Sequence, residues 1–104
     1  MKTLKLKTGH ISLVKGTAAA TFAEQYKQNP QVVTFTIEAT PDELRQYTPA
    51  TARDMVHTFT SLAREFNAAI LLVYPHNESK IQGHLGTELA NKLIDEITIN
   101  NNEE

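Results

Sequence analysis

The stretch that decides the fold is AAILLVYP, residues 68–75, which the polar run HNES follows at positions 76–79. No polar side chain precedes Tyr74 in this run, so the segment predicts a strand that is covered on both faces and lies inside a sheet. Pro75 ends the strand. Polar residues at the carboxyl end of a buried strand are the usual layout of an α/β ligand site.

Upstream of this strand, the pattern predicts a strand–helix–strand unit over residues 32–74. Residues 32–38 alternate in the manner of a strand, and Thr40 with Pro41 and Glu43 forms a strong helix start. A second helix follows over 51–66, where apolar positions recur at helical spacing. We expect the two strands to run parallel, with a right-handed crossover between them.

The two ends of the chain complete the predicted fold. Residues 2–7 and 10–15 alternate around a Thr8–Gly9 turn, which predicts an N-terminal β-hairpin. Alanine-rich residues 17–28 favour a helix, and leucines four residues apart predict a last helix over 84–97. The expectation is a single α/β domain with some α+β character over residues 1–99. It has three to four strands, helices packed on the sheet and a disordered tail at 100–104.

Composition narrows the function classes. The 104 residues suit one domain, and the absence of cysteine excludes disulfides, thiolate metal sites and a cysteine nucleophile. No apolar run reaches the roughly 18 residues of a membrane span, and the N-terminus lacks the apolar segment of a signal peptide. We therefore expect a cytoplasmic protein that does not engage membranes.

The charge distribution leaves two readings open. A net charge of −2 argues against a dedicated nucleic-acid binder. The first 16 residues nevertheless carry only basic charges, namely Lys2, Lys5, Lys7 and Lys15. These lysines could face phosphates, or they could solvate the outer face of an edge strand and block aggregation.

The predicted topology brings polar residues from two loops to one edge of the sheet. The carboxyl ends of parallel strands share an edge, so the 39–42 turn and the 75–84 loop should converge. The candidate ligand-binding residues are Thr40, Asp42, Tyr74, His76, Asn77, Glu78, Ser79 and His84. Free amides near Gly83 and Gly86 could also hold an anion.

The same residues do not complete a catalytic or metal motif. Ser79, His76 and Glu78 are the residue types of a hydrolytic triad, but no nucleophile-elbow glycines flank the serine. His76 and His84 do not have a recognised metal-ligand spacing. Solvation of an exposed loop explains these residues better than catalysis does. The sequence therefore predicts no metal, no cofactor and no assigned catalytic residue.

Two short motifs resemble the archaeal-type threonyl-tRNA synthetase editing domain. These are Tyr74–Pro75 at the end of the buried strand and the segment GHLGTELA at 83–90. The resemblance implies a fold related to D-aminoacyl-tRNA deacylases and hydrolysis of a wrong aminoacyl ester. His84 would correspond to the motif histidine that contacts substrate. The chain departs from the pattern in the inserted loop before His84 and in Gly86, which stands where the family has serine.

The sequence thus favours a small, soluble, non-catalytic binding or protein-interaction module. Its site would lie at the carboxyl ends of strands 32–38 and 68–74. The partner would be a protein or a small molecule, and self-association through the hairpin is a further hypothesis. The alternative is an aminoacyl-tRNA deacylase-like editing or RNA-end-binding domain. If the chain is an enzyme, we expect an aminoacyl-tRNA ester hydrolase.

Overall fold

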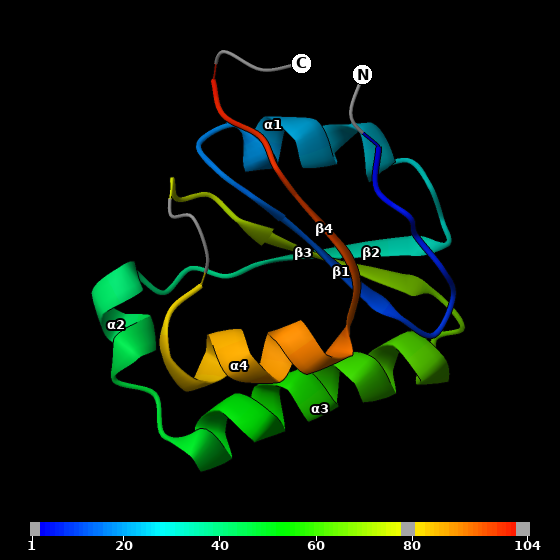
Figure 1. The fold of residues 1–104 in the computed structure, drawn as a ribbon. Helices are drawn as coiled ribbons and strands as arrows, with labels where there is room; N and C mark the ends of the chain where they lie inside the picture. The colour runs from blue at the N-terminus through cyan, green and yellow to red at the C-terminus, as the bar shows by residue number, and fades with distance from the viewer. Residues whose placement is uncertain (1–2, 78–80, 102–104) are drawn as a thin grey trace.

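The chain folds into one four-stranded parallel sheet with helices on both faces (Figure 1). The structure, a computed structural model, describes residues 3–77 and 81–101. The strands stand in the order β2-β3-β1-β4. Their bounds are β1 (Ile11–Lys15), β2 (Val32–Thr36), β3 (Ala69–Tyr74) and β4 (Leu93–Thr98). The predicted α/β class is confirmed.

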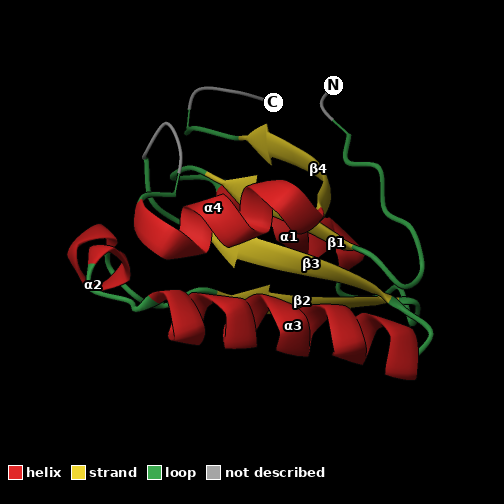
Figure 2. Cartoon of the chain, turned by 60° about the horizontal axis from the view of Figure 1, so that its bottom comes forward, coloured by secondary structure: helices red, strands yellow, loops and turns green. Residues whose placement is uncertain are grey.

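Helices cover the sheet in two outer layers. On one face lies α1 (Ala19–Ala23), which continues into the 3₁₀ turn η1 (Glu24–Tyr26). On the other lie α2 (Pro41–Arg45), α3 (Pro49–Glu65) and α4 (Gly83–Lys92). Figures 1 and 2 show α1 across the sheet from α3 and α4. In the described part of the chain, no helix combines the length and apolar character needed to cross a membrane.

The strand–helix–strand unit has the predicted geometry. β2 pairs with β3 in parallel, from Val32 opposite Ala69 to Thr36 opposite Val73. Every residue of β3 is buried, because β2 and β1 flank it and helices cover both of its faces. The prediction that 68–74 is a central strand parallel to 32–38 is confirmed.

The predicted N-terminal hairpin is wrong. β1 pairs in parallel with β3 on one side and β4 on the other, so no edge of it is left for residues 3–7. The Thr8–Gly9 turn does form, with the His10 N–H donating to the Lys7 carbonyl at 3.0 Å. It joins β1 to a segment that belongs to no strand, because both edges of β1 are already occupied.

Residues 3–7 instead cross the face of the sheet that carries α1. The Lys5 N–H donates to the Asp95 carboxylate at 2.8 Å, and the Ser12 hydroxyl donates to the Lys5 carbonyl at 3.1 Å. Leu4 and Leu6 pack into the apolar cluster on this face. β1 is therefore a central strand, and the expectation of an N-terminal edge strand is wrong.

The predicted last helix over 84–97 is correct only in its first part. α4 ends at Lys92, and the next residues form β4, which pairs with β1. Its β-branched residues Ile94, Ile97 and Thr98 favour a strand, and the second edge of β1 offers the hydrogen bonds. The regular spacing of leucines extended the predicted helix beyond Lys92, where α4 ends.

The chain end is anchored as far as the structure describes it. Ile99 is buried, and the Asn101 N–H donates to the Thr17 hydroxyl at 3.1 Å. The predicted tail also includes residues 102–104, which lie outside the described residues.

Candidate functional site

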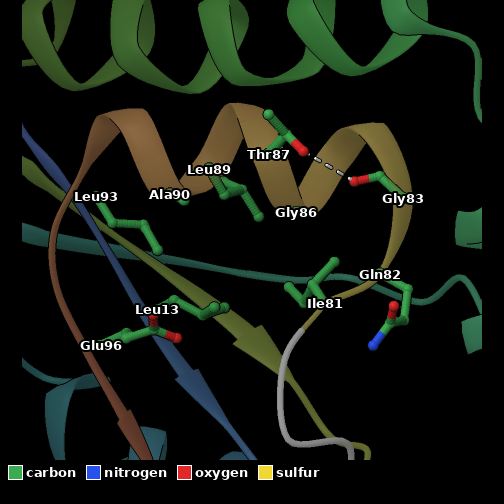
Figure 3. Close-up of a pocket in the computed structure, with 10 residues that line it drawn as sticks. All are labelled: Leu13, Ile81, Gln82, Gly83, Gly86, Thr87, Leu89, Ala90, Leu93 and Glu96. Carbon is green, nitrogen blue, oxygen red and sulfur yellow. Dashed lines mark hydrogen bonds between the residues drawn. The ribbon is translucent and has the colours of Figure 1, made fainter.

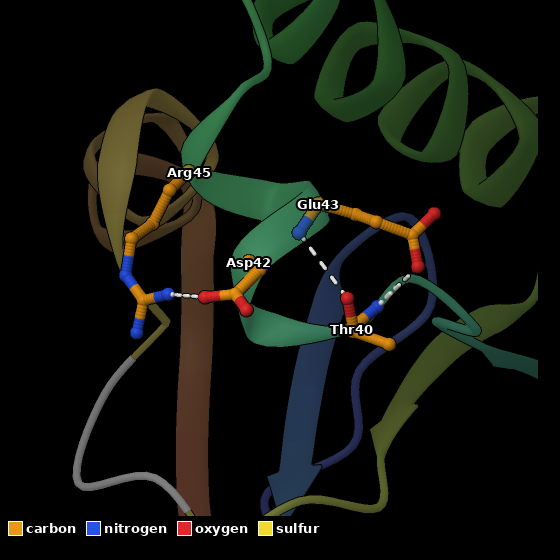
Figure 4. A network of polar contacts seen from close by, with 4 residues as sticks. All are labelled: Thr40, Asp42, Glu43 and Arg45. Carbon is orange, nitrogen blue, oxygen red and sulfur yellow. Dashed lines mark hydrogen bonds and ion pairs between the residues drawn. The ribbon is translucent and has the colours of Figure 1, made fainter.

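Two of the predicted site residues, Thr40 and Asp42, serve the start of α2 (Figure 4). The Glu43 N–H donates to the Thr40 hydroxyl at 3.2 Å, and the Thr40 N–H donates to the Glu43 carboxylate at 3.1 Å. This capping box satisfies amides that the helix leaves free. Asp42 is exposed and pairs with Arg45. Both side chains therefore have local structural partners.

Three further predicted residues follow the end of β3. The Tyr74 ring is buried, and the His76 ring packs against it with centroids 4.8 Å apart. His76 is half-buried and Asn77 is exposed. Glu78 and Ser79 lie outside the described residues. The structure thus brings Tyr74 and His76 together at the carboxyl end of the sheet.

His84 lies on the exposed side of the first turn of α4. The neighbouring Gly83 lies against α2: a Cβ on it would be 3.3 Å from the Leu44 carbonyl oxygen. The loops after β2 and β3 therefore lead to helices whose ends meet. The contact that the structure records lies between Gly83 and the end of α2 at Leu44 and Arg45. Convergence of the 39–42 turn itself with the 75–84 loop stays a prediction.

The strand order creates a switch point between β1 and β3. The chain leaves β1 towards α1 on one face and leaves β3 towards α4 on the other. The two strands are joined there by the Gly16 N–H, which donates to the Tyr74 carbonyl at 3.1 Å. Ligands of open α/β sheets characteristically bind where neighbouring strands send their connections to opposite faces.

A buried lysine lies at this switch point. Lys15, the last residue of β1, has a side chain that is 7% exposed, and its Nζ is 3.2 Å from a Glu96 carboxylate oxygen. The Glu96 side chain is 48% exposed. The pair joins β1 to β4, and it fixes the Glu96 carboxylate on the face of the sheet that carries α4.

A cavity of about 340 Å³ adjoins that carboxylate, between α4 and the β1–β4 half of the sheet (Figure 3). Its apolar walls come from β1, β4, α4 and the segment before α4, and the polar side chains around it belong to Gln82, Thr87 and Glu96. The lining residues are Leu13, Ile81, Gln82, Gly83, Gly86, Thr87, Leu89, Ala90, Leu93 and Glu96.

Close backbone packing shapes one end of this cavity. A Cβ on Gly86 would lie 1.9 Å from the carbonyl oxygen of Ile81, so only glycine lets the incoming segment approach α4 this closely. Gly83 adopts a positive φ of 76° at the helix start. Sequence reasoning selected both glycines for anion binding; here they form part of the cavity wall.

The four lysines of the nucleic-acid alternative do not share one environment. Lys5 and Lys7 are exposed on the segment before β1, Lys15 is buried against Glu96, and Lys2 lies outside the described residues. Binding of tRNA stays a prediction. Among residues 3–77 and 81–101, no cluster of His, Asp or Glu side chains could hold a metal ion.

Apart from Gly83 and Gly86, sequence reasoning missed the residues that line the cavity and the lysine that pairs with Glu96. Glu96 and Leu93 fell within a predicted helix, and Lys15 within a predicted solvent-facing strand. The β-branched residues after Lys92 were the available signal, because recognising β4 would have placed Glu96 beside β1.

Comparisons with protein-family models, with curated proteins and with solved structures find no match to this chain.

Proposed function

We propose that this protein is a small-molecule binding module without catalysis of its own, and that its ligand occupies the cavity between α4 and strands β1 and β4. The observation that carries this proposal is the cavity itself, whose volume of about 340 Å³ falls in the range of small-molecule sites. The combination of apolar walls with the polar side chains of Gln82, Thr87 and Glu96 supports it, since small-molecule sites are mostly apolar with a few polar groups.

The lining indicates the class of ligand. Leu13, Leu89 and Leu93 offer apolar contact, whereas the Glu96 carboxylate offers a charged hydrogen-bond acceptor. Lys15 pairs with that carboxylate. A ligand with a small apolar body and an ammonium or other donor group fits this arrangement, because charge-assisted hydrogen bonds are the stronger ones.

Nuclear magnetic resonance titrations test the proposal. A set of small primary amines with aliphatic or aromatic bodies would be added to ¹⁵N-labelled protein, together with the matching alcohols. We expect saturable shifts confined to amides of α4, β1 and β4, with amines binding more tightly than alcohols. Glu96→Gln should remove the preference for amines.

A matched pair of variants locates the ligand. Ala90 lines the cavity, so Ala90→Leu should fill part of it and abolish the shifts. Ala50, exposed in the first turn of α3, is the control, and Ala50→Leu should bind as the parent chain does. If no compound shifts these amides saturably at millimolar concentration, or if Ala90→Leu binds unchanged, the proposal is wrong.

A further inference from the structure

The sheet has two outer strands, and their sequences differ in charge. β4 carries Asp95 and Glu96 in its middle, so pairing with the same strand of a second copy would bring acids together. β2, with the sequence VVTFT, has no charged residue to prevent such pairing. Natural sheets usually protect their edges with charges, and β2 lacks that protection.

The outer edge of β2 presents backbone hydrogen-bonding groups. The Ala69 N–H donates to the Gln31 carbonyl and the Ile37 N–H donates to the Val73 carbonyl, so odd-numbered residues of this segment face β3. The N–H and C=O groups of the alternate residues, Thr34 and Thr36, therefore point away from the sheet. They are available to a further strand.

The side chains of β2 are self-complementary about Thr34. In an antiparallel pair centred on this residue, the two Thr34 residues exchange N–H···O=C bonds. Val33 then lies opposite Phe35 of the second copy, and Val32 lies opposite Thr36. An aromatic residue facing a β-branched one and threonine facing threonine are both favourable cross-strand pairs.

Helix α3, which lies along β2 in Figure 2, carries an apolar stripe. Met55, Phe59, Leu62 and Phe66 recur at the four–three–four spacing of a helix–helix seam. Phe59 packs on Phe35 of β2, with ring centroids 5.5 Å apart, which turns this stripe towards the β2 edge. The first three are half-buried, and Phe66 is 59% exposed.

A hollow lies on the first half of α3. It measures about 300 Å³ and is lined by Thr51, Asp54, Met55, Thr58 and Phe59. In an antiparallel pair of α3 helices, residues 55 and 66 lie opposite each other, as do 59 and 62. The Phe66 ring of one copy would then enter the hollow beside Met55 of the other.

The same two-fold axis can relate both the two β2 strands and the two α3 helices. α3 runs antiparallel to β2, with Phe59 opposite Phe35. A strand advances about 3.3 Å per residue and a helix about 1.5 Å, so the point opposite Thr34 lies about two residues beyond Phe59. The centre of the apolar stripe, between Phe59 and Leu62, falls at that same point.

We propose that two copies of this chain associate through β2, joining their sheets across the Thr34 pair and packing their α3 helices against each other. The occupant of this surface is a second copy because the strand and the helix stripe are both self-complementary about the same axis. This inference is independent of the proposed ligand, since the cavity lies against β1 and β4, whereas β2 is the strand at the opposite edge of the sheet.

Sedimentation equilibrium of the full chain, from low micromolar to millimolar concentration, tests the association. We expect the parent chain to reach the dimer mass with rising concentration. Thr34→Lys would place two ammonium groups together at the axis, and Phe66→Glu would empty the hollow. Each should raise the dimer dissociation constant at least about tenfold.

Both altered side chains are exposed in the single chain, so the variants should fold, as circular dichroism would verify. Thr21→Lys, an equivalent change on exposed Thr21 of α1, should leave the dimer unaffected. A mixture of Thr34→Lys and Thr34→Glu chains should recover the dimer, because the axis sets position 34 against itself.

A monomer mass for the parent chain at millimolar concentration overturns the proposal. If Thr34→Lys or Phe66→Glu dimerises with the dissociation constant of the parent chain, the proposal is overturned as well. If the parent chain dimerises and the Lys–Glu mixture stays monomeric, the proposed register is wrong.

Discussion

The ion pair between Lys15 and Glu96 should respond unequally to the loss of its two partners. The Lys15 side chain is 7% exposed and the Glu96 side chain 48% exposed, at a separation of 3.2 Å. Unit charges at this distance attract by about 5 kcal/mol at an effective dielectric constant of about 20, and desolvation of the lysine opposes most of that attraction. The outcome therefore depends on which charge is left behind.

Glu96→Gln removes the carboxylate that lies 3.2 Å from the buried Lys15 ammonium group. Losing a hydrogen bond to a charged group costs about 1.5–3 kcal/mol, so we expect about 2 kcal/mol of destabilisation. Lys15→Met removes the buried charge and keeps an unbranched side chain. It leaves a carboxylate that water already reaches, so the expected change is within about 1 kcal/mol of zero.

Urea denaturation, followed by circular dichroism, measures both changes, and the double variant completes the cycle. On the Lys15→Met background, Glu96→Gln should have little effect, because the charge that required Glu96 is absent. The reasoning fails if Lys15→Met destabilises the fold as much as Glu96→Gln does, or if the two effects simply add.

Three further changes test the core, the loop before α4 and the α2 cap, each by urea denaturation. Leu72 is fully buried in β3, so Leu72→Ala should cost about 2–5 kcal/mol; a loss below about 1 kcal/mol would contradict its central place. Gly86→Ala would set a methyl group 1.9 Å from the Ile81 carbonyl oxygen, and the forced backbone shift should cost at least about 2 kcal/mol. Thr40→Ala removes the hydroxyl that caps α2 and should cost about 1 kcal/mol, and an unchanged midpoint would show that the cap adds nothing.

The candidate site shows how far local patterns reach. Parallel pairing of 32–38 with 68–74 was predictable. The polar residues of the loops did not indicate that the Thr40 side chain forms a capping box. They also did not indicate that a cavity with apolar walls lies between α4 and strands β1 and β4. The cavity depends on Leu13 and Glu96, which are more than eighty residues apart in sequence and opposite each other in the sheet.

By itself, the sequence determined the elements whose signals are local. The unbroken apolar run of β3 requires cover on both faces, the capping residues start α2, and the helical spacing of apolar residues gives α3. Only the tertiary structure decided the roles of the two chain ends. β1 can bond two neighbours, and β3 and β4 take both places, so residues 3–7 stay outside the sheet and residues 93–98 leave the helix. Strand pairing is settled by which edge is free, and that is a property of the assembled sheet.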